Sequence, residues 1–319
     1  MTADFQLSNK IFFLYETCAR QQALFSKLLD PDFQLAAVDY YLLYRLVDTI
    51  EDADFNENLK IKLLTEIQKD FIRGLKNASE ILLKANNDFQ YKNLFLESAD
   101  IFKFHFSLPQ EIQKLIENYG KIMAGGMAKF IEKLIKYNNA ETQYFIKNLD
   151  EFDEYCYYAA GCVGELNSEL YLLFSNKKIN AAEKNIFLKN GAQLGNYLQT
   201  VNIIRDYYSD NNKKNYLPQD CPSDNITGKI NLIIDCARKK ENSIKEYLAS
   251  IENNNYYCYC NTLFEIAKLH IDFYYENNKI QDSGMLKKLI KPQPLKIFFK
   301  LPLKLKLHFL KYKIKKMSR

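Results

Sequence analysis

Residues 40–52 read Tyr-Tyr-Leu-Leu-Tyr-Arg-Leu-Val-Asp-Thr-Ile-Glu-Asp, and their surroundings have the spacing of a helix. Asp48 and Asp52 are four residues apart and share a helix face, with Glu51 three residues from Asp48. Carboxylates at this spacing repel one another and destabilise an isolated helix. Because carboxylate oxygens are ligands that Mg²⁺ prefers, the stretch predicts a metal-binding helix face. The alternative is a solvated acidic face.

A second set of oxygen-bearing side chains follows later in the chain. Asn202, Asp206 and Asp210 are spaced four residues apart, so they form one stripe along a helix, and Gln199 extends it by nearly a turn. The residues between them are largely apolar, which indicates a mostly buried helix. Two Asp side chains on a buried helix are costly unless cations pair with them.

Each acidic face is accompanied by an arginine, Arg45 in the first and Arg205 in the second. Facing carboxylates can hold Mg²⁺ ions that bridge a diphosphate. Arginine side chains form bidentate hydrogen bonds with phosphate oxygens. Two such faces in one chain therefore favour a site that ionises an allylic diphosphate over two solvated surfaces.

Apolar residues recur every three to four positions over long segments, and alternating period-two runs are lacking. Two examples are the sets Ile61, Leu64, Ile67, Phe71, Leu75 and Leu188, Ala192, Gly195, Leu198, Val201. The sequence therefore predicts an all-α, single-domain bundle with at least eight helices. Breaks are expected at Asp30-Pro31, Asn86–Asp88, Ser107–Pro109, Asn138–Asn139, Asn176–Asn180, Asp210–Asn215 and Asn253–Asn255.

Composition excludes several classes of protein. An apolar fraction of 47% with mixed charge indicates a globular chain. The seven cysteines are scattered and include no CxxC pair, so we interpret them as reduced thiols of a cytosolic protein. The first residues do not resemble a signal peptide, and no segment approaches the ~20 apolar residues of a membrane span. His105, His270 and His308 are isolated and are interpreted as structural.

Charge divides the chain at residue 285. Residues 285–319 contain 11 Lys, one Arg and no acidic residue, so the first 284 residues carry 32 basic against 39 acidic side chains. An acidic body argues against nucleic acid as a partner. We therefore expect a helical domain over residues 1–284 and a separate basic tail over 285–319.

The tail interleaves its lysines with Leu, Ile and Phe, and Pro292, Pro294 and Pro302 limit any helix to its last part. Basic residues are attracted to anionic lipid headgroups, and apolar ones add burial at the interface. This pattern predicts a cytoplasmic protein that binds an anionic membrane surface peripherally. A disordered, solubilising tail is the alternative.

Four motifs resemble the squalene/phytoene synthase family, in family order, over about residues 10–220. They are Asp48-Thr-Ile-Glu-Asp52, Tyr155-Cys-Tyr-Tyr-Ala-Ala-Gly161-Cys-Val-Gly164-Glu165, Asn202-Ile-Ile-Arg-Asp206-Tyr-Tyr-Ser-Asp210 and Tyr216-Leu-Pro-Gln219. The first and third are most similar to the squalene synthase branch. The resemblance implies an all-α isoprenoid synthase-like bundle with a central apolar cavity, in which two farnesyl diphosphates are condensed head to head with Mg²⁺ through presqualene diphosphate.

The resemblance also implies a role for particular residues. The metal ligands would be Asp48, Glu51, Asp52, Asn202, Asp206 and Asp210. Of these, the four aspartates would be catalytic together with Tyr155. The substrate-binding residues would be Arg20, Tyr41, Arg45, Gln199, Arg205, Gly161 and Gly164. The two glycines would let a helix approach the prenyl chain closely, or alternatively let two helices pack closely.

The sequence departs from the family pattern at the end of the second acidic motif, Tyr208-Ser209-Asp210, where an acidic residue commonly precedes the last Asp, and in two further places. Arg20 lies in Cys18-Ala-Arg20-Gln-Gln, where the family has small hydroxyl residues, and no Pro-Gln-containing helix is recognisable in Ile251–Glu276. The missing Pro-Gln-containing helix leaves open whether NADPH is used. A non-reductive dehydrosqualene, phytoene or presqualene diphosphate synthase is therefore one alternative, and a non-catalytic binding or assembly protein on the same fold is another.

Overall fold

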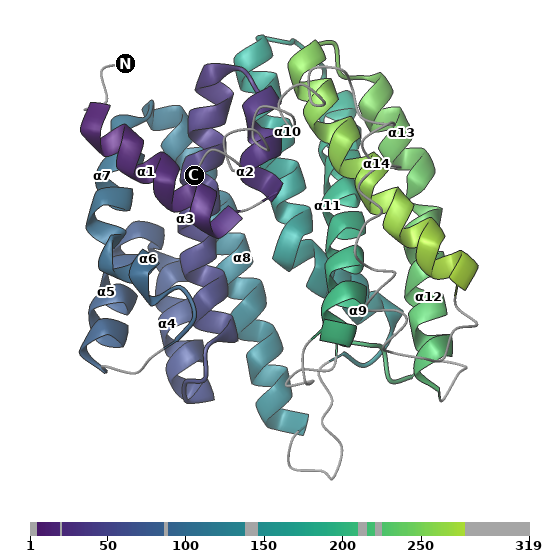
Figure 1. Ribbon diagram of the computed structural model, residues 1–319, viewed down its shortest axis with the longest axis horizontal. Coiled ribbons are helices and arrows are strands. Elements are labelled where there is room, and N and C mark those ends of the chain that lie inside the picture. The colour runs from purple at the N-terminus through teal and green to yellow at the C-terminus, as the bar shows by residue number, and fades with distance from the viewer. Residues whose placement is uncertain are drawn as a thin grey trace, which may run out of the picture.

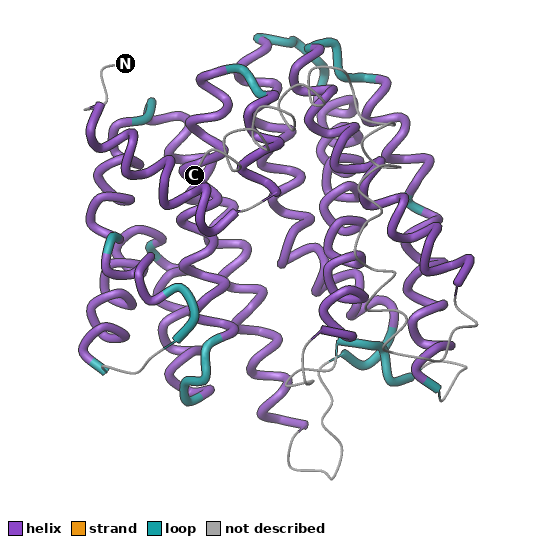
Figure 2. The backbone as a smooth tube through the Cα atoms, in the orientation of Figure 1, coloured by secondary structure: helices purple, strands orange, loops and turns teal. Residues whose placement is uncertain are grey.

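The computed structural model describes residues 5–19, 21–85, 89–137, 146–209, 216–220 and 225–277. Every regular element in these ranges is helical (Figure 2), which confirms the all-α prediction. The elements are α1 (Phe5–Ala19), α2 (Gln21–Phe25), η1 (Ser26–Leu28), α3 (Pro31–Asp52), α4 (Glu57–Lys69), α5 (Phe71–Lys84), α6 (Lys92–Leu96), α7 (Ser98–Ser107), α8 (Gln110–Tyr137), α9 (Leu149–Cys156), η2 (Tyr157–Gly161), α10 (Cys162–Ser175), α11 (Ala181–Ser209), α12 (Ile226–Lys239), α13 (Glu241–Ala249) and α14 (Asn254–Asn277).

Two groups of helices lie on either side of a middle layer (Figure 1). Helices α1–α7 gather on one side and α11–α14 on the other, with α8 and α10 between them. The long helix α8 packs along α3, α4 and α10, while α11 packs against α10, α13 and α14. Buried apolar side chains from both groups form one continuous core. The expected central cavity stays a prediction, and the tail lies outside the described residues.

Asparagine and aspartate side chains begin several of the helices. Asn56, Asp70, Asn148 and Asn225 each accept a hydrogen bond from a backbone N–H in the first turn of α4, α5, α9 and α12. Asn176 ends α10 in the left-handed conformation, with φ of 51°. Such caps explain why an asparagine-rich sequence still divides into well-defined helices.

Four of the expected breaks coincide with helix ends: Asp30-Pro31, Ser107–Pro109, Asn176–Asn180 and Asn253–Asn255. The other three lie outside the described residues. None of the described helices is long and apolar enough to cross a membrane.

Helices α9, η2 and α10 form one continuous rod whose middle turn has π-helical geometry. This rod packs against α11 through glycines. A methyl group added to Gly164 would meet the carbonyl of Gly191, and one added to Gly195 would meet the carbonyl of Ala160. The two helix backbones therefore touch along a glycine seam, which we define as Gly161, Gly164, Gly191 and Gly195.

Candidate metal and diphosphate site

Three carboxylates gather at the C-terminal end of α3. One oxygen each from Asp48, Glu51 and Asp52 can be chosen so that all lie within 4.8 Å of one another. Glu51 is buried, Asp48 is partly buried and Asp52 is exposed. The C-terminal end of a helix carries partial negative charge, so anions are unfavourable there. An all-oxygen donor set in this position fits a hard divalent cation such as Mg²⁺, which would offset both repulsions.

Arg45 lies one turn before this cluster and is held by three partners. Its Nη1 forms an ion pair with Asp48, and its Nη2 donates to the hydroxyl of Tyr41 at 2.9 Å. The guanidinium carbon lies 5.3 Å from the ring centroids of both Tyr41 and Tyr91. Its Nε is buried and has no hydrogen-bond partner among the described residues. The arginine is therefore held in place with one donor still available for an anion.

Tyr155 reaches the carboxylate cluster from α9. Its ring lies 4.9 Å from that of Tyr216, which follows the second acidic motif in sequence. Burial, the neighbouring phenol of Tyr216 and the charge of Glu51 raise the pKa of Tyr155 well above 10.0. The phenol of Tyr155 is therefore neutral and can donate a hydrogen bond.

The second acidic face lies in the C-terminal half of α11. Asn202 donates from Nδ2 to Oε1 of Gln199 at 3.4 Å, and both side chains are partly buried. Arg205 is exposed, and its charge adds to burial in lowering the pKa of His270 on α14. Asp206 lies in the helix, but its side chain is outside the described residues, as are Arg20 and Asp210.

The structure places Gly161 and Gly164 in the glycine seam against α11. A methyl group at Gly161 would meet the side-chain oxygen of Asn196. These contacts agree with the alternative in which the two glycines let helices pack closely. A contact of either glycine with substrate stays a prediction.

Two residues of the site carry no motif in the sequence. Tyr91 begins α6 with φ of 62°, an uncommon conformation for a tyrosine, and covers Arg45. Lys60 on α4 is 3% exposed and donates from Nζ to the carbonyl oxygen of Glu51 at 3.2 Å. The burial of Lys60 could have been predicted from sequence, because Lys60 shares the apolar face of α4 with Leu63 and Leu64.

Replacing Lys60 with Met should lower the stability of the metal-free protein by about 1–2 kcal/mol, because a carbonyl at the end of α3 loses its donor. The same change should enlarge the gain in melting temperature on adding Mg²⁺, since one compensating cation is missing. Thermal denaturation with and without Mg²⁺ measures both effects. Lys62→Met, at an exposed position of the same helix, is the control. Equal Mg²⁺ responses in the two variants would contradict this role.

The fold and site together define an all-α protein with three clustered carboxylates beside a partly buried arginine. Comparison with known proteins extends this assignment. The family model described as squalene/phytoene synthase matches residues 16–227. The chain belongs to the squalene/phytoene synthase family.

Curated relatives include squalene synthases from fungi and plants. The squalene synthase of Schizosaccharomyces pombe is 28% identical over 63% of this chain and 42% of its own length. That of Solanum lycopersicum is 28% identical over 73% of this chain and 51% of its own. Inactive squalene synthase 2 of Arabidopsis thaliana is 29% identical over 58% and 40%. The matched segments thus span about half the length of these relatives or less.

A solved structure confirms the fold. The complex of TcSQS with the ligand BPH1237 superposes with a TM-score of 0.71 and 17% identity, over 93% of each chain. At this identity the likeness shows the isoprenoid synthase-like helical fold alone.

Proposed function

We propose that this chain is a Mg²⁺-dependent prenyltransferase that condenses two farnesyl diphosphates head to head through presqualene diphosphate. The observation that carries the proposal is the carboxylate triad Asp48, Glu51 and Asp52 beside Arg45, which Asp48 and two tyrosines hold in place. Membership of the family supports the same reaction type.

The residues of this chain have separate tasks in the proposed reaction. Arg45 binds diphosphate oxygens through the buried Nε, while the rings of Tyr41 and Tyr91 keep the guanidinium in place. The neutral phenol of Tyr155 lies beside the carboxylate cluster, close enough for the charges of Glu51 and Asp52 to raise its pKa. Mg²⁺ held by the three carboxylates, and by Asn202, Asp206 and Asp210 in the full site, would neutralise charge on the leaving group.

In the first half-reaction the allylic C–O bond of the donor breaks and diphosphate leaves with the bonding electrons. The double bond of the acceptor attacks the resulting cation, and loss of a proton closes a cyclopropane ring. A second ionisation and rearrangement follow. Hydride from NADPH would then give squalene, whereas proton loss would give dehydrosqualene.

The test is incubation of the purified full chain with farnesyl diphosphate and Mg²⁺, with and without NADPH, and identification of the lipid by mass spectrometry. A C30 product that disappears with EDTA is expected. Squalene formed only with NADPH selects the reductive enzyme, and the same lipid with and without NADPH selects the non-reductive alternative. Binding of substrate without any product would favour a non-catalytic protein. One relative of this chain carries the name inactive squalene synthase 2.

We further propose that residues 285–319 bind anionic membranes, because their 11 lysines alternate with apolar residues and no acid is present. Deleting the tail should abolish co-sedimentation with anionic liposomes while Mg²⁺-dependent turnover in detergent persists. Replacing the tail lysines with Gln separates the electrostatic contribution from the apolar one. Failure of the full chain to co-sediment at low salt would contradict the proposal.

A further inference from the structure

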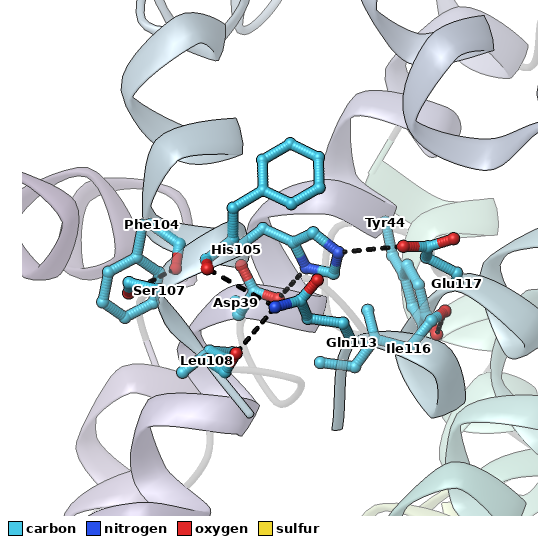
Figure 3. Close-up of polar contacts among 10 residues, drawn as sticks. Asp39, Tyr44, Phe104, His105, Ser107, Leu108, Gln113, Ile116 and Glu117 are labelled. Atoms are coloured by element: carbon cyan, nitrogen blue, oxygen red, sulfur yellow. Dashed lines mark hydrogen bonds and ion pairs between the residues drawn. The ribbon is translucent and has the colours of Figure 1, made fainter. Parts of the chain in front are cut away.

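Away from the proposed metal site, a histidine that lies between two carboxylates joins three helices. Nδ1 of His105 on α7 lies 2.7 Å from Oδ2 of Asp39 on α3, and Nε2 lies 3.3 Å from Oε1 of Glu117 on α8. Figure 3 shows the imidazole between the two carboxylates. His105 and Asp39 are fully buried, whereas Glu117 is 28% exposed. With an acceptor on each side, the ring is suited to the doubly protonated imidazolium.

The electrostatic balance of this cluster depends on the imidazolium. Burial by itself lowers the pKa of His105, but the hydrogen bond and charge of Asp39, and then those of Glu117, raise it above 6.5. Oδ1 of Asp39 is buried and has no hydrogen-bond partner among the described residues. A charge buried with so few donors is costly unless a cation lies next to it. Burying this cluster therefore costs free energy that an apolar core of the same size would not require.

The same part of α8 also contacts α3 directly. The hydroxyl of Tyr44 donates to the backbone oxygen of Ile116 at 2.7 Å, next to Glu117 in sequence. Tyr44 is followed directly by Arg45, and Asp48 lies one turn further on. The two contacts fix α3 against α8 immediately before the residues that form the metal and diphosphate site.

We propose that Asp39, His105 and Glu117 form a positioning clamp that fixes α3 against α7 and α8 and thereby sets the geometry of the carboxylate triad. This inference rests on the proposed function, because it assumes that the triad binds Mg²⁺. His105 touches neither metal nor substrate and acts through α3. The clamp differs from an ordinary buried pair in that its effect must appear in Mg²⁺ binding as well as in stability.

The clamp also predicts a direction of pH dependence. The group that titrates is His105, and the titratable groups that face the pair are Glu117 from α8 and Tyr44 from α3. Because the folded pKa is raised, the stabilisation by the imidazolium is present below 6.5 and is lost as pH rises through the folded value. Mg²⁺ affinity should weaken over the same rise in pH.

The test uses Glu117→Gln in the full chain, since this partly exposed position tolerates substitution better than His105. Glu132→Gln, at an exposed position of the same helix, is the matched control. Mg²⁺ is titrated in the presence of inorganic pyrophosphate and followed by calorimetry and by melting temperature across a pH series. We expect the half-saturating Mg²⁺ concentration of Glu117→Gln to rise about tenfold and its pH profile to change, with Glu132→Gln like the wild type. Asp39→Asn should give the same change in Mg²⁺ dependence.

Three outcomes are possible for the wild type and Glu117→Gln. Weaker Mg²⁺ binding with an altered pH profile supports the clamp. Lower stability with wild-type Mg²⁺ affinity and an unchanged profile overturns it, because the cluster would then stabilise the fold alone. No Mg²⁺ binding by the wild type would overturn the proposed function, and the clamp with it.

Discussion

Replacing Asp48 with Asn is expected to lower Mg²⁺-dependent turnover by at least about 100-fold while the helical fold survives. The substitution removes one charged oxygen ligand and also the ion-pair partner of Arg45, whose guanidinium is then held by Tyr41 and Tyr91 alone. It relieves repulsion among the three carboxylates, so the metal-free protein should be no less stable than the wild type. Activity assays and thermal melts with and without Mg²⁺ measure the two effects separately.

Asp32→Asn is a matched control, because Asp32 is exposed in the first turn of the same helix and lies far from the triad along α3. It should keep full activity and a normal Mg²⁺ response. Near-normal turnover of the Asp48 variant would overturn the assignment of the triad as the metal site.

The second large effect is expected in the glycine seam. Gly164→Ala should lower the free energy of unfolding by about 2 kcal/mol or more. The new methyl group would overlap the carbonyl group of Gly191, whose carbonyl carbon would lie only 2.8 Å from the methyl carbon. A backbone group cannot rotate away as a side chain can, so α10 and α11 would have to separate. Denaturant unfolding measures the loss.

Gly125→Ala is the control for this prediction. Its methyl group would meet only the flexible side chain of Gln68, and alanine is the better helix former. This variant should be neutral or slightly stabilised. Equal stability of the Gly164 and Gly125 variants would show that the two helices can move apart at little cost.

The first acidic face could be predicted from sequence because all three carboxylates belong to one helix. Spacings of three and four residues between Asp48, Glu51 and Asp52 are enough to place them together once a helix is assumed. The helix ends at Asn176 and Asn253 were predictable for a similar reason, since turn and capping preferences are local.

The partners from other helices could not be predicted in this way. Lys60 and Tyr91 come from α4 and the start of α6, and only tertiary packing brings them to α3. His105 was interpreted as an isolated structural histidine, yet its partners Asp39 and Glu117 are 66 and 12 residues away in sequence. The close approach at Gly164 depends likewise on a neighbouring helix.

The π-helical turn η2 makes the length of the α9–α10 rod as important as its composition. Each residue added to or removed from a helix turns everything beyond it by about 100°. Because a π-helical turn holds one residue more than an α-helical turn, deleting one residue within Tyr157–Gly161 would restore regular α-helix there and leave Tyr155 and Gly164 near their present faces, whereas adding one would rotate Gly164 away from Gly191. Homologous chains that keep the contact of Gly164 with Gly191 are therefore expected either to have this number of residues and a π-helical turn, or one residue fewer and a regular α-helix.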